Sequence, residues 1–173
     1  MIRPILIYGN PKLRESSVVI SQFGYMGLDI LIADMFETIK NADGVGLAAP
    51  QIGLNIRLII VNIEEENFKK AFINPDITFK SDNLVSEIEN CLSLPNLAGP
   101  VERPDKIEIV YANGNLKYQK ESFEGLKARV IQHEIDHLDG VLWIDHLGEN
   151  RKLINEPLEY IKNMNVKVNY PIL

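Results

Sequence analysis

The stretch that most constrains this chain is His133-Glu134-Ile135-Asp136-His137. Two histidines four residues apart project from one face of an α-helix and can bind a single divalent metal ion, so the spacing predicts a helix here. The glutamate after the first histidine would lie next to the open coordination position, where a carboxylate can accept and return the protons of a water molecule. An ordinary amphipathic helix can also carry this pattern by chance, so the surrounding segments have to support the metal site.

Length, charge and cysteine content narrow the class of protein. With 173 residues, 46% of them hydrophobic, we expect residues 1–173 to form a single domain with a sizeable core. The net charge of -6 argues against nucleic acid as a partner. No apolar run approaches membrane-spanning length, and residues 1–7 lack the features of a signal peptide. A lone cysteine excludes an internal disulfide, so we expect a cytoplasmic protein.

Helical periodicity marks two main segments. Apolar residues recur at helical spacing over residues 28–39. A second helix should run over residues 124–138, carry both histidines and end at Asp139-Gly140. Near the end of the chain, Pro157 interrupts a helical pattern, so we expect only a short helix that begins at Glu156 or Pro157.

Strand patterns fill the space between these helices. Residues 56–63 and 71–73 are predicted to be strands, the second one ended by Asn74-Pro75. Alternating apolar residues on both sides of Asn113-Gly114 predict a β-hairpin over residues 107–118. The predicted fold class is therefore α+β, with short antiparallel strands and β-hairpins packed around a central metal-binding helix.

Two histidines leave a metal site short of a third protein ligand. The candidates are a distant acidic residue, His146 and the single Cys91. His146 lies beyond the predicted helix end and would have to fold back, so we expect it, like Asp145, to be a surface or packing residue. Cys91 lies in an extended segment, residues 89–95. A lone cysteine is more often a small buried hydrophobic residue than a ligand, but the paired histidines favour Cys91.

The predicted metal-binding helix also carries an apolar stripe. Leu126 and Val130 precede His133 and His137 at steps of three to four residues, so all four share one face. An apolar surface beside a metal predicts a substrate with a hydrophobic side chain. Packing of Leu126 and Val130 into the core explains the periodicity equally well.

Residues 44–53 read Gly-Val-Gly-Leu-Ala-Ala-Pro-Gln-Ile-Gly. A nucleotide-binding loop is excluded because Gly-Lys-Ser/Thr is missing, and because Pro50 and a strand follow where a helix should begin. Small residues suit a backbone that must come close to another group. The side-chain amide of Gln51 is a neutral donor that can stabilise an oxyanion.

Together, these three segments resemble the peptide deformylase family. That family carries Gly-x-Gly-Leu-Ala-Ala-x-Gln, Glu-Gly-Cys-Leu-Ser and Gln-His-Glu-x-x-His segments in this order, matched here by residues 44–51, 89–93 and 132–137. The resemblance covers nearly the whole chain, from Tyr8 to Leu147. It implies one catalytic domain that removes the formyl group from the N-formylmethionine of new polypeptides and releases formate.

The resemblance also implies roles for particular residues. Glu134 would be the general base and acid, and Gln51 with the backbone N–H of Leu92 would bind the oxyanion. The metal would be held by Cys91, His133 and His137. The resemblance favours Fe(II) as this metal, although Zn, Ni or Co also suit such ligands. The pocket for the methionine side chain and the peptide backbone would be bordered by Val45, Gly46, Glu89, Leu126 and Val130.

The chain departs from the family pattern in two places. Asn90 stands where the family has glycine, and asparagine is the non-glycine residue that best tolerates positive φ, so our hypothesis is a left-handed Asn90. The segment after Trp143 is shorter than in relatives, so a ribosome contact is only a weak expectation. We expect N-formylmethionyl peptides as partners, no nucleic acid, no membrane, and a monomer.

Two other classes share some of these features. A zincin-type metallopeptidase has the same helix motif but takes its third ligand downstream, so the Cys91 segment argues against it. A catalytically silent relative that binds N-terminal peptides is the second, suggested by Asn90. An assay that compares turnover of a formylated and an unformylated peptide, together with the metal content of the protein, distinguishes the deformylase, the metallopeptidase and the silent relative.

Overall fold

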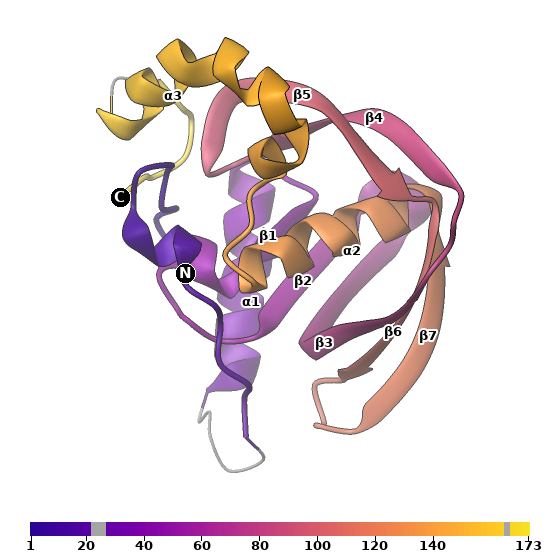
Figure 1. Ribbon diagram of the computed structural model, residues 1–173. Helices are drawn as coiled ribbons and strands as arrows, with labels where there is room; N and C mark the ends of the chain where they lie inside the picture. Colours follow the sequence, from indigo (N-terminus) through magenta and orange to yellow (C-terminus); the bar gives the residue numbers. More distant parts are fainter. Residues whose placement is uncertain (22–26, 165–166) are drawn as a thin grey trace.

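The computed structural model describes residues 1–21, 27–164 and 167–173 and has the predicted α+β fold (Figure 1). Within these ranges the α-helices are α1 (Leu28–Asn41), α2 (Gly125–Leu138) and α3 (Asn155–Lys162). The strands are β1 (Gly46–Ala48), β2 (Leu58–Ile63), β3 (Phe68–Lys80), β4 (Leu84–Cys91), β5 (Leu94–Pro104), β6 (Lys106–Ala112) and β7 (Tyr118–Glu124). The 3-10 helices cover Pro11–Arg14, Ala49–Ile52, Glu64–Glu66 and Trp143–Ile154.

Two antiparallel sheets form the framework. The larger has the strand order β1-β2-β3-β6-β7, and the smaller is the β4-β5 pair. Figure 1 shows α2 lying between the two sheets. Because α2 contacts both sheets, its side chains can meet residues from either sheet.

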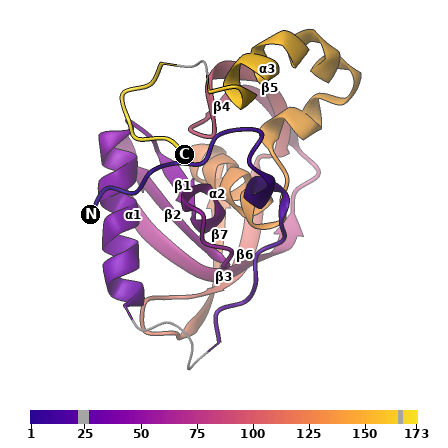
Figure 2. The same cartoon turned by 90° about the vertical axis from the view of Figure 1, so that its left-hand side faces the viewer.

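Alternation along β2 explains why helices cover both faces of the larger sheet. Ile59 and Val61 belong to the buried cluster that includes α2 residues such as Ile131. Leu58 and Ile60 belong to the cluster that includes α1 residues, and α1 stands along the other face in Figure 2. Full burial of an isoleucine or leucine side chain contributes about 1.5–3 kcal/mol, so this strand fixes both helices strongly.

A third cluster attaches the smaller sheet to the chain after α2. Leu94 and Val101 of β5 pack with Trp143, Leu158 and related residues. A Cβ at Gly99 would lie 2.7 Å from the Trp143 ring, so only glycine allows the ring to pack this closely against β5. This packing holds the end of β4, and therefore Cys91, close to α2.

The strand expected over residues 71–73 is longer than predicted. β3 runs through Asn74-Pro75, which we expected to end it. The register with β6 shifts between Ile73 and Asp76, and Asn74 takes a left-handed φ of 51°. β2 pairs with β3 only up to Ile73, so at Pro75 the edge of β3 that faced β2 has no strand beside it. A proline, which lacks an N–H group, is tolerated at such an unpaired edge. The bulge therefore accommodates both residues within the strand.

The hypothesis of a left-handed Asn90 is wrong. Asn90 is an exposed residue of β4, opposite Ala98 of β5. The extended backbone of β4 continues through Asn90, and the register with β5 shifts only after it, between Asn90 and Cys91. In the part of the chain that the structure describes, the non-glycine residues with positive φ are Asp43, Asn67, Asn74, Asn96, Leu116 and Met164.

The other predicted elements lie close to their expected places. α1 and α2 match the two expected helices, and α3 begins just before Pro157. β6 and β7 form a hairpin at the expected turn, but Leu116 belongs to the turn, with a φ of 57°, and β7 runs on to Glu124, beyond the predicted end at residue 118. β2 begins two residues later than expected, at Leu58. No helix in the described ranges has the length and apolarity needed to cross a membrane.

Candidate active site

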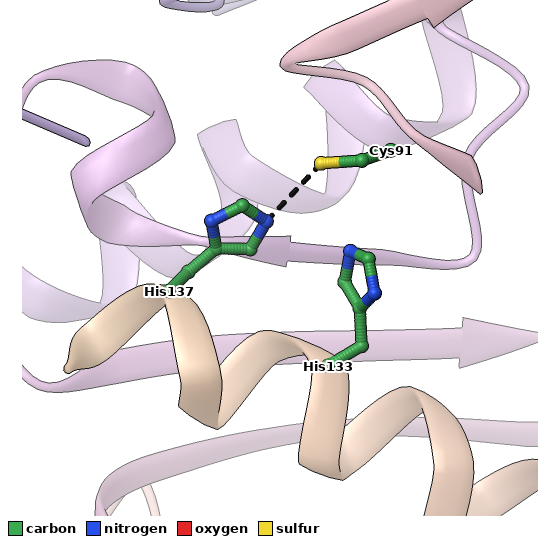
Figure 3. Close-up of side chains that lie close together, drawn as sticks. All are labelled: Cys91, His133 and His137. Carbon is green, nitrogen blue, oxygen red and sulfur yellow. Dashed lines mark hydrogen bonds between the residues drawn. The ribbon is translucent and has the colours of Figure 1, made fainter. Parts of the chain in front are cut away.

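Three potential metal ligands meet between α2 and the end of β4 (Figure 3). His133 and His137 project from neighbouring turns of α2, and Cys91 is the last residue of β4. Their ligand atoms all lie within 4.8 Å of one another, and the three side chains are buried. Cys91 Sγ lies 3.2 Å from His137 Nε2. The structure thus brings the three sequence candidates into one group that could hold a metal ion.

The chemistry of this group fits a transition metal. His133 Nδ1 is hydrogen-bonded to Glu89 Oε2 at 2.9 Å, which leaves its Nε2 as the free ring nitrogen. Burial raises the pKa of the Cys91 thiol, but the neighbouring His137 and His133 outweigh it and bring the pKa down to about 5. A thiolate and two imidazoles are ligands that suit Fe, Zn, Ni and Co, so the residues present fit a single ion.

Glu134 lies beside this group without belonging to it. Its side chain is buried, and burial raises its pKa to about 7 against the opposing effect of the two histidines. Glu134 Oε2 and His137 Nδ1 have no hydrogen-bond partner among the described residues. Buried polar atoms normally have one, so the site suits a further polar species such as a water molecule.

Gly46 explains how Glu134 fits against β1. A Cβ on Gly46 would lie 2.4 Å from Glu134 Oε1, far closer than side chains approach in proteins. The missing side chain therefore makes the space that the carboxylate occupies. Gly46 is held in place by its pairing with Val61 of β2.

Gln51 lies on the 3-10 helix Ala49–Ile52, a short element that was not predicted ahead of the strand expected over residues 56–63. Its Oε1 accepts a hydrogen bond from Ala48 N–H at 2.8 Å, and this fixes which end of the amide points inward. Its Nε2 donates to Ser93 Oγ at 3.2 Å and lies 3.6 Å from Cys91 Sγ. The side-chain amide of Gln51 therefore faces the metal-ligand group.

Leu92 occupies the turn between β4 and β5. Its carbonyl oxygen accepts a hydrogen bond from Tyr170 Oη at 2.7 Å. Its side chain packs tightly on Gly44, because a Cβ added to Gly44 would lie 2.9 Å from Leu92 Cδ1. Burial and the nearby Cys91 raise the pKa of Tyr170 to about 12, so its hydroxyl remains a donor at neutral pH. Sequence reasoning missed Tyr170, because nothing in the pattern of the last residues points to Leu92.

A cavity of about 810 Å³ opens next to the metal-ligand group. Val45 and Leu126 are exposed, whereas Val130 is 7% exposed and belongs to the core cluster between α2 and the larger sheet, so it faces both core and cavity. Leu126 is 44% exposed, which excludes a purely core role. The sequence candidates that line this cavity are Val45, Gly46, Gln51, Glu89, Cys91, Leu92, Leu126, Val130, His133 and Glu134.

A buried network of charges holds Glu89. Arg103 Nε and Arg129 Nη1 both donate to Glu89 Oε1, at 2.6 and 2.8 Å, and His133 Nδ1 contacts Oε2. Burial raises the pKa of Glu89, but the hydrogen bonds from His133 and Arg103 outweigh it and hold the pKa far below its usual range. Arg103 also donates to Asp136. Glu89 therefore orients His133, one of the three potential metal ligands, and also lines the cavity.

Sequence reasoning missed Arg103 and Arg129 because their partner lies 14 and 40 residues away along the chain. The available sign of this charge network in the sequence was Arg129, a charged residue that directly precedes Val130 of the apolar stripe. Such a residue needs a buried partner, since an unpaired buried charge costs several kcal/mol, roughly 3–5 when one partner is removed.

The remaining histidine lies outside the metal-ligand group. His146 Nε2 contacts Asp136 Oδ2 at 2.8 Å, at an exposed position. Asp145 accepts hydrogen bonds from Arg14, Arg151 and the backbone N–H of Leu142. Both residues pack at the end of α2, as the sequence predicted.

The fold and the site together define a class of protein. A buried Cys-His-His group beside a free carboxylate and an amide donor, all open to one cavity, is the arrangement of a metal-dependent hydrolase.

Comparison with known proteins narrows this class. The sequence profile described as polypeptide deformylase matches residues 2–153. A peptide deformylase of Karelsulcia muelleri is 46% identical over 151 residues, which cover 85% of this chain and 79% of the relative. One of Chlorobium phaeovibrioides is 40% identical, with 99% and 93% covered. The crystal structure of peptide deformylase from Thermus thermophilus matches with a TM-score of 0.88 at 37% identity, covering 95% and 99%. The chain belongs to the polypeptide deformylase family.

Proposed function

We propose that this protein removes the formyl group from the N-formylmethionine that begins new polypeptides, releasing formate and a free amino terminus. The observation that carries the proposal is the meeting of Cys91, His133 and His137 with Glu134 at one cavity. The family membership supports the choice of a formamide as the bond that is cleaved.

In this proposal Cys91, His133 and His137 hold one metal ion, and Fe(II) is the ion that the family resemblance favours. When bound, the ion supplies Lewis-acid chemistry, lowering the pKa of a water ligand to about 7 and polarising the formyl carbonyl. Glu89 supports this arrangement, because its hydrogen bond to His133 Nδ1 keeps that ring turned with Nε2 free.

Glu134 carries the protons of the reaction. As water attacks the formyl carbon, its carboxylate accepts the proton that the water loses. It later delivers a proton to the departing amine of the methionine, so the residue ends in its starting state. Burial raises the pKa of this carboxyl above its usual range, which favours a group that takes up a proton and gives it back.

Gln51 and the Leu92 N–H stabilise the negative oxygen of the tetrahedral intermediate. The bond from Ala48 N–H holds the Gln51 amide by its oxygen, so its Nε2 end already faces the site before the charge develops. One such donor is worth about 2.7–4 kcal/mol in related acyl-transfer chemistry.

The side chain of the substrate methionine would lie along the apolar part of the cavity. Val45 and Leu126 stand at its exposed edge, and Val130 forms a buried part of its wall. Gly46 and Glu89 complete the border with the substrate backbone. We further propose that residues 1–173 form one catalytic domain, that the protein is a cytoplasmic monomer, and that it makes at most a weak ribosome contact.

The direct experiment is an assay of purified protein with a formyl-Met peptide, an acetyl-Met peptide and the same peptide with a free amino terminus. The proposal expects formate and one new amine per turnover from the formylated peptide alone. Cleavage of an internal peptide bond would identify a zincin-type metallopeptidase instead. Metal content without any turnover would identify a silent peptide-binding relative.

A further inference from the structure

Residues 167–173 lie beside the active site but have no part in the function proposed above. Residues 167–170 line the cavity. The following residues are bound to the beginning of the chain, where Ile5 N–H donates to Pro171 O at 2.8 Å and Leu173 N–H donates to Ile5 O at 2.9 Å. Figure 2 shows this last, yellow segment passing beside the start of the chain. These contacts hold the backbone next to Tyr170 in place.

Tyr170 extends from this segment to the turn between β4 and β5. Its hydroxyl donates to the carbonyl oxygen of Leu92 at 2.7 Å, the usual length of a well-formed O–H···O bond. The ring is partly buried and packs with the Leu92 side chain against the same core cluster. The hydroxyl therefore restrains the residue whose N–H is the proposed oxyanion donor.

Other contacts hold the neighbouring residue of the turn. Tyr8 N–H donates to Ser93 O at 2.8 Å, and Gln51 Nε2 donates to Ser93 Oγ at 3.2 Å. Both of these bonds restrain Ser93. The bond from Tyr170 restrains Leu92, one residue nearer to the metal ligand Cys91.

We propose that Tyr170 is a positioning residue that holds Leu92 so that its N–H points at the developing oxyanion. The inference rests on the proposed function, because it needs the Leu92 N–H to face the formyl oxygen. An oxyanion donor helps only when it is aimed before the charge appears, and an error of about 1 Å in the position of a reacting group can cost about 100-fold. Since Ser93 remains held, we expect a smaller loss here.

The test is Tyr170→Phe, which keeps the ring and removes only the hydroxyl. We expect kcat to fall about tenfold while KM changes by less than about twofold, because an interaction made in the transition state affects kcat. Amide hydrogen exchange over residues 90–95 should become faster, whereas metal content and the thermal midpoint stay at their wild-type values. Tyr160→Phe, at an exposed position of α3, is the matched control and should change none of these quantities.

Three results would overturn the inference: a wild-type kcat, a rise in KM alone, and a large fall in the thermal midpoint. The second would make Tyr170 part of the wall that binds the peptide, and the third would make it a residue of the fold. Gln51→Ala in the same assay separates this inference from the proposed function. If Gln51→Ala lowers kcat and Tyr170→Phe does not, only the role of Tyr170 fails; if neither lowers kcat, the oxyanion assignment itself fails.

Discussion

The replacement Gly46→Ala tests whether the position of the Glu134 carboxylate controls turnover. The added Cβ would lie 2.4 Å from Glu134 Oε1 and 2.9 Å from Cγ and Cδ, whereas ordinary contacts begin at 3.4 Å. The carboxylate oxygen must therefore retreat by about 1 Å, because β1 is held by its pairing with β2 and cannot easily move instead. A displacement of about 1 Å in catalytic geometry can lower the rate about 100-fold, equal to a barrier about 2.7 kcal/mol higher.

The assay is formate release by Gly46→Ala, with metal content and thermal unfolding measured on the same preparation. We expect kcat to fall about 100-fold with the metal retained. Overpacking costs about 1–3 kcal/mol, so the thermal midpoint should fall by about 2–12 °C. Gly114→Ala is the matched control, since an added Cβ there meets nothing within 4 Å. A Gly46→Ala protein with wild-type kcat would refute the reasoning.

Four further substitutions test single residues. Glu134→Gln should keep the metal and lose at least about 100-fold in kcat, because an amide cannot carry the proton; unchanged formate release would refute this role. Cys91→Ser should lose metal on dialysis against a mild chelator, and full occupancy would place the third ligand elsewhere. Val130→Phe should lower kcat/KM for formyl-Met peptides more than for formyl-Gly peptides, whereas an equal loss would make Val130 a core residue only. Asn90→Val should keep its metal content and thermal midpoint, because β-branched residues suit an extended strand; loss of either would contradict the strand conformation.

The α2 segment was predictable because its signals are local. Histidine spacing, the apolar stripe and the Asp139-Gly140 stop all lie within one helix, and the helix observed begins and ends within a residue of that expected. The strand β6 and the turn after it were predictable for the same reason, since the apolar alternation and the Asn113-Gly114 signal are contiguous, whereas the prediction ended at residue 118, where β7 begins.

The parts that sequence reasoning missed depend on distant partners. β3 continues through Pro75 only because β2 no longer pairs with it there, and the length of a neighbouring strand cannot be read from the residues of β3. The position of Asn90 is set by a register shift against β5, and no property of asparagine reveals it. Arg103 and Tyr170 act on Glu89 and Leu92, which are far away in the sequence. The functions of the site residues remain predictions for the experiments above.

The most direct test of the account is reconstitution of the metal-free protein with increasing amounts of Fe(II) under anaerobic conditions. Formate release from a formyl-Met peptide is recorded at each step, with Zn, Ni and Co in parallel series. Because Cys91, His133 and His137 form a single ligand group, activity should rise linearly and stop at one ion per chain. Formate release by the metal-free protein, or a rise that continues well beyond one ion per chain, would contradict the account.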